Sequence, residues 1–294
     1  MHFRKITIVG VGLLGGSLGL AVKRRRLAGN VTGFVRRAAS VTECRKFRAV
    51  DFATRDLQSA VEGADLIILC TPLAQMRELV KQFLPALSRG AIVTDVGSVK
   101  ASVVREIEAL VHKGGGHFIG SHPMAGAEKT GVAAARADLF VGAACVVTPT
   151  RKSNPAALRK VEQFWKAVGG RVLRLSPEIH DVLVSRSSHL PHVIAATLAN
   201  LVLDPAHPES QAALCATGFR DTTRIASGSP EMWRDIALAN RKNLARELGA
   251  FVAGLQKVRR ALNRGQERDI LKFLQQAKLR RDAWCARCAS PSPE

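Results

Sequence analysis

From residue 5 to about residue 175, short runs of β-branched and other apolar residues alternate with amphipathic stretches. The runs have the length and composition of buried strands, and we predict strands at 5–10, 30–35, 66–72, 91–97, 117–122, 144–149 and 171–175. Between them, as at 75–87 and 99–111, apolar residues recur at helical spacing. This alternation predicts an α/β domain built on a parallel sheet.

The strand-like runs stop after residue 175. Ser176-Pro177-Glu178 combines a capping hydroxyl, a proline for the first turn and an acid near the positive end of the helix dipole. The segment at 229–231 repeats this pattern. The sequence therefore predicts an all-α domain over residues 176–284, followed by a tail at 285–294.

A glycine-rich turn, GVGLLG at residues 10–15, joins the first predicted strand to the first predicted helix. Its first glycine allows a tight turn, the second lets a pyrophosphate approach the backbone, and the third lets helix and strand pack closely. The start of the helix then faces the phosphates. We therefore predict that residues 1–175 form a Rossmann-type dinucleotide-binding domain, with the cofactor at Gly10, Gly12, Leu13, Leu14 and Gly15.

The end of the second predicted strand bears on the choice of dinucleotide. An NAD site usually carries an acid about 20 residues after the glycines, where it holds the ribose 2′-hydroxyl. Between Gly16 and Thr42 the chain has no aspartate or glutamate, and Arg36 and Arg37 stand in that place. Two guanidinium groups can bind a 2′-phosphate, so the pattern favours NADP over NAD. Alternatively, the two arginines are ordinary surface cations of a basic chain.

Two candidate catalytic residues follow strands of the predicted sheet. Ligands of open α/β sheets bind outside the carboxyl ends of the strands, and both Ser98 and His122 fall at such ends. Imidazole transfers protons readily near neutral pH, so His122 is a candidate base. Ser98 is a candidate beside it, although a serine before a helix is also a common N-cap.

The helical half adds polar groups. Four of them recur every three or four positions on an otherwise apolar helix: Ser185, Ser188, His189 and His192. Such a stripe either bonds to neighbouring backbone or lines a polar cavity. Farther along, Arg220, Asp221 and Arg224 precede Trp233. An arginine here either pairs with Asp221 or holds a carboxylate of a ligand.

The composition of the chain limits which classes of molecule it is expected to bind. Lysine and arginine number 44 against 24 acids, a formal charge of +20 that attracts anions of any kind. Aromatic residues make up only 5% and tyrosine is absent, so we do not expect a nucleic-acid-binding protein. The scattered cysteines favour a reducing, cytoplasmic location, and the CxxC at 285–288 has no second ligand pair that would indicate a metal site. The one long uncharged stretch is rich in glycine, so we expect no membrane span.

Several motifs occur in one order: GVGLLGGSLG, ILCTP, VTDVGSVK, FIGSHPMAGAEKTG, SSHLPH and GFRDTTRIASGSPEMWRDI. In this order they resemble the prephenate and arogenate dehydrogenase family of tyrosine biosynthesis, over roughly residues 4 to 280. The resemblance implies an NAD(P)-dependent oxidative decarboxylation of a cyclohexadiene to a phenol. In that reaction His122 takes the proton of the ring hydroxyl as hydride passes to the nicotinamide.

The same resemblance implies further roles. Ser98 hydrogen-bonds near the reacting hydroxyl, and Arg224 anchors a substrate carboxylate. Glu128 and Asp221 belong to an ionic network that gates the site. The implied substrate site comprises Arg224, His189, His192, Ser188, Trp233, Glu128 and Asp221. Thr71 and Pro72 of ILCTP join the implied cofactor site. A homodimer through the C-terminal helices is also expected.

The resemblance leaves the substrate open. His192 favours prephenate, because family members that use prephenate tend to have histidine there, whereas NADP use is common among arogenate enzymes. We expect a prephenate dehydrogenase that forms 4-hydroxyphenylpyruvate, with an arogenate or a dual cyclohexadienyl dehydrogenase as alternatives. Two other hypotheses remain. One is a β-hydroxyacid dehydrogenase or imine reductase that uses a lysine; the other is a basic nucleotide- or nucleic-acid-binding protein without catalysis.

Overall fold

The computed structural model describes residues 2–127 and 129–289, and of residues 288 and 289 the backbone alone. The described residues form two compact units, one up to residue 243 and the other from residue 244 on. The first unit contains the sheet and the helices that follow it. The second contains most of one long helix and the whole of the next.

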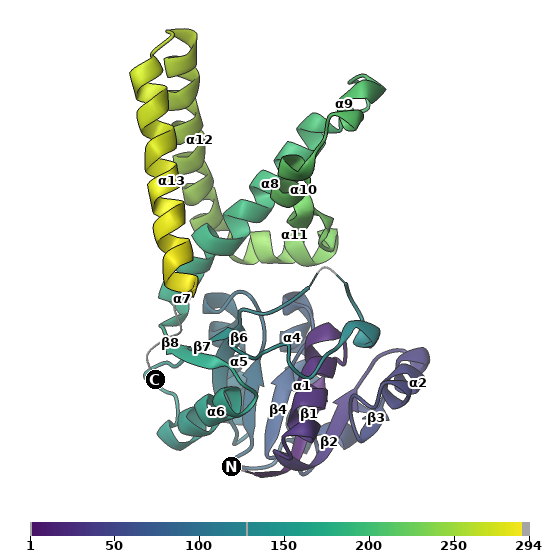
Figure 1. Cartoon of the computed structure of the whole chain (residues 1–294). Coiled ribbons are helices and arrows are strands. Elements are labelled where there is room, and N and C mark those ends of the chain that lie inside the picture. The colour runs from purple at the N-terminus through teal and green to yellow at the C-terminus, as the bar shows by residue number, and fades with distance from the viewer. Residues whose placement is uncertain (1, 128, 290–294) are drawn as a thin grey trace. The chain divides into compact units, whose positions relative to one another are not determined.

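The first unit is built on a sheet with the strand order β3-β2-β1-β4-β5-β6-β7-β8 (Figure 1). Its strands are β1 (Phe3–Val9), β2 (Ala28–Phe34), β3 (Phe52–Thr54), β4 (Leu66–Leu69), β5 (Ile92–Asp95), β6 (His117–Pro123), β7 (Ala144–Thr148) and β8 (Arg171–Arg174). Every strand that the sequence predicts is present. β3 is absent from the prediction because three residues are too few to show a pattern.

The sheet is parallel from β3 to β6 in spatial order, as predicted. β7 pairs with β6 in the antiparallel sense, and β8 runs parallel to β7, so the parallel prediction does not hold for these two strands. Parallel neighbours need a long crossover, usually a helix. The described residues between β6 and β7 form only the short turn η2 (Val132–Ala134), so the chain returns in the opposite direction.

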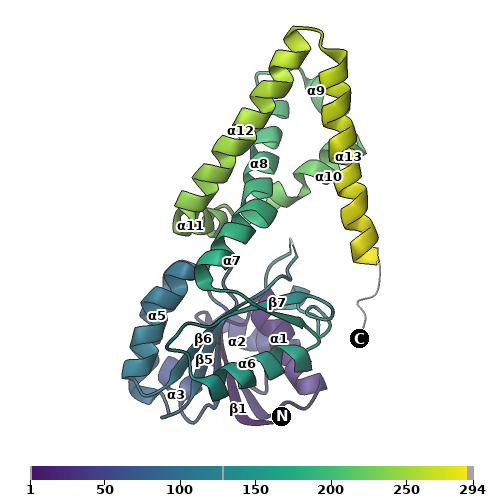
Figure 2. The same ribbon diagram turned by 90° about the vertical axis from the view of Figure 1, so that its left-hand side faces the viewer.

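Helices cover both faces of the sheet (Figures 1 and 2). They are α1 (Leu13–Arg24), α2 (Ala38–Lys46), α3 (Leu57–Val61), α4 (Leu73–Phe83), which continues into η1 (Leu84–Ala86), α5 (Ala101–Lys113) and α6 (Pro155–Ala167). α1 and α6 pack on one face, and α3, α4 and α5 on the other. Along β4, Leu66 and Ile68 join the first core and Ile67 and Leu69 the second, all fully buried. Burial on both faces explains why these strands are continuous apolar runs.

Two helices that follow the sheet begin where the sequence predicts. Ser176 Oγ accepts the backbone N–H of Ile179 at 3.2 Å, and Ser229 Oγ accepts that of Met232 at 3.3 Å. The elements are α7 (Pro177–Val184), the π-helical turn η3 (Ser185–His189), α8 (Leu190–Val202), α9 (Glu209–Ala213), α10 (Thr217–Thr223), η4 (Arg224–Ser227) and α11 (Pro230–Ala239). The helical character predicted for this half is confirmed.

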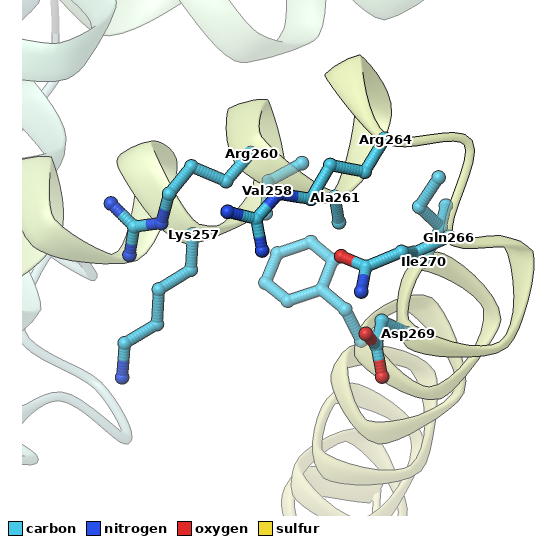
Figure 3. A pocket seen from close by; sticks show the side chains of 9 residues that line it. Lys257, Val258, Arg260, Ala261, Arg264, Gln266, Asp269 and Ile270 are labelled. Carbon is cyan, nitrogen blue, oxygen red and sulfur yellow. The ribbon is translucent and has the colours of Figure 1, made fainter.

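The second unit is a helical hairpin. α12 (Arg241–Asn263) and α13 (Glu267–Ala289) are joined at Gly265, whose φ of +62° suits glycine. α13 runs past residue 284, where the sequence predicts the helices to end. Near the turn a cavity of about 240 Å³ is lined by Lys257 and Arg260 on α12, by Arg264 in the turn itself, and by Asp269 and other residues of α13 (Figure 3). In the part of the chain that the structure describes, every helix is too short or too polar to cross a bilayer.

Candidate active site

Two glycines of the GVGLLG turn have a steric reason in the structure, and the third leaves the backbone open. Gly10 has a φ of +98°, and a Cβ there would lie 2.8 Å from the carbonyl oxygen of Cys70. A Cβ on Gly15 would lie 2.0 Å from the carbonyl oxygen of Gly10. A Cβ on Gly12 would have no atom of more distant described residues within 4 Å, so the backbone is open to a ligand. The turn therefore has the close packing and the open approach that a pyrophosphate requires.

The start of α1 is suited to an anion. Gly12 is its N-cap, no side chain caps the helix, and its first turn contains no acid. The unpaired N–H groups and the positive end of the dipole are therefore available to phosphate oxygens. The side-chain oxygen of Thr71 is buried nearby and has no hydrogen-bond partner among the described residues. These features fit a dinucleotide.

A pocket of about 200 Å³ opens at this turn. Its lining includes these predicted cofactor residues: Gly10, Gly12, Arg36, Arg37, Thr71 and Pro72. Leu13, Leu14 and Gly15 do not line it. The sequence prediction missed other lining residues, among them Ser40, Glu43, Gln75, Gly131 and Val132. Gly131 and Val132 come from the loop after β6, and no local pattern links that loop to the glycine turn.

Arg36 and Arg37 lie between β2 and α2 and are exposed. Neither guanidinium forms an ion pair or hydrogen bond with the described residues of the chain. Glu43 of α2 lines the same pocket, and it is the first acid after the stretch from Gly16 to Thr42, which contains none. The pocket wall at this point therefore carries two unpaired cations and one acid.

His122 lies near the end of β6, at the carboxyl edge of the parallel strands, and is only 8% exposed. Its Nδ1 lies 2.9 Å from Nε2 of His180, and Nδ1 of His180 lies 2.8 Å from Oδ1 of Asp181. Burial holds the pKa of His122 well below its ordinary value of 6.5, and the neighbouring His180 and Lys100 act in the same direction. His122 is therefore a neutral imidazole at neutral pH and can accept a proton.

A buried ion pair lies beside this histidine. Lys100 is fully buried, and its Nζ donates to Oδ2 of Asp95 and, at 2.8 Å, to the carbonyl oxygen of Ser121. Asp95 also accepts the backbone N–H groups of Gly97 and Ser121. Burial lowers the pKa of Lys100, and Asp95 opposes that effect. The pair fixes the ends of β5 and β6, and the sequence prediction missed both of its members.

Ser98 is half-buried and does not cap α5. The cap comes from Asp181, whose two carboxylate oxygens accept the backbone N–H groups of Lys100 at 2.7 Å and Ala101 at 2.9 Å. The N-cap alternative for Ser98 is therefore wrong. Within the described residues its hydroxyl has no hydrogen-bond partner, which leaves it available to a ligand.

The helical wall is formed by η3, α8 and α11. His192 stacks on Trp233 with ring centroids 3.5 Å apart and an interplanar angle of 11°. His189 meets the same indole edge-on at 6.2 Å, and its Nδ1 lies 3.2 Å from Nδ2 of Asn240. Burial lowers the pKa of His189 to about 4, although the Asp181 carboxylate acts to raise it. Nε2 of His189 is buried and has no hydrogen-bond partner among the described residues.

The other predicted polar residues are distributed around this wall. Ser185 Oγ donates to the backbone carbonyl of Val182 at 2.7 Å, so this serine bonds to neighbouring backbone, which is one of the two alternatives for the polar stripe. Ser188 is half-buried. Asp221 on α10 and Arg224 at the start of η4 are exposed. η4 ends before Gly228, where a Cβ would lie 2.6 Å from Nε1 of Trp233 and 3.3 Å from Cε1 of His192. Glu128 lies outside the described residues.

The fold and site together define a class of protein. A dinucleotide turn and a buried neutral histidine lie at the same edge of one sheet, and the helical half supplies a polar and aromatic wall. This is the layout of a dinucleotide-dependent oxidoreductase with a general base.

Comparison with known proteins gives the family. Residues 18–174 match the nucleotide-binding domain of prephenate dehydrogenase, and residues 176–276 match its dimerization domain. The chain is 35% identical to a cyclohexadienyl dehydrogenase of Zymomonas mobilis over 264 residues, 88% of this chain and 89% of that one. The chain belongs to the prephenate and arogenate dehydrogenase family, a family of oxidoreductases. This membership decides against the lysine-dependent and non-catalytic hypotheses.

Two solved structures show the same architecture. Prephenate dehydrogenase from Aquifex aeolicus, in complex with hydroxyphenyl propionate and NAD+, matches with a TM-score of 0.90 and 32% identity, over 96% of this chain and 99% of that one. Synechocystis arogenate dehydrogenase matches with a TM-score of 0.80 and 31% identity, over 96% and 100% of the two chains. A nicotinamide dinucleotide as the cofactor agrees with the nucleotide-binding domain and the first of these structures.

The buried histidines predict a loss of stability in acid. Burial lowers the pKa of four of them: His122, His180, His189 and His192. The unfolded chain takes up protons near pH 6.5 while the folded chain does not, so stability is full above pH 6.5 and falls as pH drops toward 4. For His189, whose pKa in the folded chain is about 4, the contribution is up to about 1.4 kcal/mol per pH unit in that interval. Unfolding temperatures measured between pH 7.5 and 5 should fall, and less steeply for His189→Gln; a flat profile would contradict the prediction.

Proposed function

We propose that the protein is a prephenate dehydrogenase, which converts prephenate to 4-hydroxyphenylpyruvate and carbon dioxide. The observation that carries the proposal is the buried, neutral His122 at the same sheet edge as the glycine turn. His122 takes the proton of the ring hydroxyl, and the ring carboxylate leaves as carbon dioxide. A bound nicotinamide would supply the acceptor for the hydride of the carbon that carries the hydroxyl. Formation of the aromatic ring drives the reaction, so the protein mainly aligns the reactants and takes one proton.

Neighbouring groups support this role. The hydroxyl of Ser98, which has no partner among the described residues, is available to the reacting hydroxyl of the substrate. His189 is 1% exposed, and its Nε2 is buried without a hydrogen-bond partner among the described residues, so we place it in the buried part of the substrate site. We place the substrate against Ser188, His192 and Trp233, with Arg224 as the carboxylate anchor. Asp221 and Glu128 keep their expected part in a gating network.

His192 supports prephenate over arogenate. The two substrates differ in the side chain, which is a keto acid in prephenate and an amino acid in arogenate. Burial lowers the pKa of His192, so its ring is neutral, and its Nδ1 is buried without a partner among the described residues. A neutral imidazole that can donate a hydrogen bond suits a keto oxygen better than an ammonium group. Arogenate use and dual use stay open as alternatives.

One experiment tests the choice of substrate and the choice of cofactor. The purified protein is assayed with NAD and NADP against prephenate and arogenate, following nicotinamide absorbance. We expect the highest kcat/KM with prephenate. A preference for arogenate would move the protein to the arogenate dehydrogenases, and no turnover of either substrate would overturn the proposed function.

We propose NADP as the preferred cofactor, because Arg36 and Arg37 line the pocket with unpaired guanidinium groups. Changing both to alanine should weaken NADP binding at least about tenfold while NAD binding changes little, because only NADP carries the 2′-phosphate. Arg45→Ala is the matched control, since Arg45 lies on α2 and does not line the pocket. Dissociation constants from fluorescence titration give the comparison. Equal losses for both nucleotides would refute the assignment.

We also propose that two copies associate through the helical half. Residues 176–276 match a dimerization domain, and the hairpin of the second unit exposes large apolar side chains along both helices. They include Val252, Leu255, Leu262, Leu271, Phe273, Leu274 and Leu279. Exposed apolar area of this kind is typical of an interface. Light scattering should give twice the chain mass of 31.7 kDa, and a monomer at micromolar concentration would contradict the proposal.

A further inference from the structure

A line of three buried side chains runs from His122 into the interior of the first unit. His122 contacts His180, and His180 contacts Asp181, at 2.9 and 2.8 Å. Their exposed fractions are 8%, 0% and 2%. His180 and Asp181 belong to α7, so the line joins the helical half of this unit to the sheet edge that carries His122.

The hydrogen bonds of this line fix where each proton lies. Both oxygens of Asp181 accept backbone N–H groups from the start of α5, so the carboxylate acts as an acceptor toward His180 as well. His180 therefore carries its proton on Nδ1, and in a neutral ring its Nε2 is then an acceptor. It follows that Nδ1 of His122 donates to His180, and Nε2 of His122 is left without a proton. That nitrogen is the one able to act as a base.

Asp181 also links this line to the Ser98 segment. α5 begins shortly after Ser98, and its first N–H groups are capped by Asp181 rather than by a nearby residue. The backbone carbonyl of Asp181 in turn accepts Nδ2 of Asn240, which contacts His189. Asp181 therefore contacts the start of α5, which follows Ser98, the ring of His180, which contacts His122, and the amide of Asn240, which contacts His189.

We propose that His180 and Asp181 are positioning residues, which hold His122 in the tautomer whose Nε2 faces the substrate unprotonated. The inference rests on the proposed function, in which His122 is the base. Neither residue touches the substrate. When His122 takes the proton on Nε2, its Nδ1 proton remains in the hydrogen bond to His180, so no further transfer is needed. The Asp181 carboxylate contacts His180 and acts to raise the pKa of that ring, so it favours positive charge at the inner end of the line.

The test compares two variants that leave the Asp181 cap of α5 intact. His180→Phe keeps a ring in the cavity but removes the acceptor for Nδ1 of His122. His180→Gln restores an acceptor oxygen near the position of Nε2. We expect His180→Phe to lower kcat at least about tenfold, with cofactor affinity unchanged, and His180→Gln to recover part of the loss.

The tautomer is read directly from the ring ¹⁵N chemical shifts of His122, assigned by comparison with His122→Asn. In the wild-type protein and in His180→Gln, Nε2 should have the shift of an unprotonated nitrogen; in His180→Phe the shift should move toward that of a protonated one. A protonated Nε2 in the wild-type protein, or an unchanged shift in His180→Phe, would overturn the inference. This measurement needs no turnover, so inactivity of the wild-type protein would overturn the proposed function separately.

Discussion

Replacing His122 by asparagine is expected to lower kcat at least about a hundredfold while leaving cofactor affinity close to that of the wild-type protein. His122 is the buried neutral imidazole at the sheet edge, and asparagine fills a similar volume but cannot take a proton at neutral pH. The glycine turn and the Arg36 side of the pocket are not altered by the change. Steady-state rates with each substrate, together with nucleotide titration, measure the two effects separately.

The pH profile gives a second measure of the same residue. Because burial lowers the pKa of His122 well below 6.5, the wild-type rate should hold through neutral pH and decline only well below pH 6.5. His117→Asn is the matched control: His117 begins the same strand that carries His122 near its end. It should leave kcat nearly unchanged. If His122→Asn kept most of the turnover, the base would have to be sought elsewhere, and the buried Lys100 would be the first candidate.

The fold could be predicted from local patterns because burial on both faces leaves a direct trace in the sequence. β4 is continuous and apolar since its residues alternate between two cores, and the glycine turn has its spacing because Gly10 and Gly15 touch. No sequence pattern indicated that β7 runs antiparallel to β6. That direction depends on the absence of an α-helix between β6 and β7 among the described residues, which is a property of the connection and not of the strand.

The site was predictable only where a residue follows a strand or belongs to a motif. His122 and Ser98 were found in this way. His180 and Asp181 were not, although they lie in the predicted helix, because their role depends on partners some 60 to 80 residues away in the sequence. Lys100 likewise stands next to a predicted residue, but nothing in the sequence shows that its amine is buried against Asp95. Pairing across elements requires the fold.

That buried pair carries the largest expected effect on stability. Asp95→Asn removes the charge opposite Lys100 while the amine stays fully buried, and we expect a loss of about 3 to 5 kcal/mol in the free energy of unfolding. The cost arises because a charge taken out of water without a partner is strongly disfavoured. The urea midpoint of the variant, measured with the wild-type protein at one pH, gives the value.

A double variant separates loss of the pair from loss of packing. Asp95→Asn combined with Lys100→Met leaves no buried charge at this place, so the double variant should be more stable than Asp95→Asn alone. The matched control is Asp65→Asn, which breaks the ion pair to Arg4, a pair whose arginine side chain is 87% exposed. Its effect should be far smaller, because water screens exposed charges. If Asp95→Asn and Asp65→Asn lowered the midpoint equally, Lys100 would have to reach solvent or lose its proton at little cost. The ion pair could then not be what fixes the ends of β5 and β6.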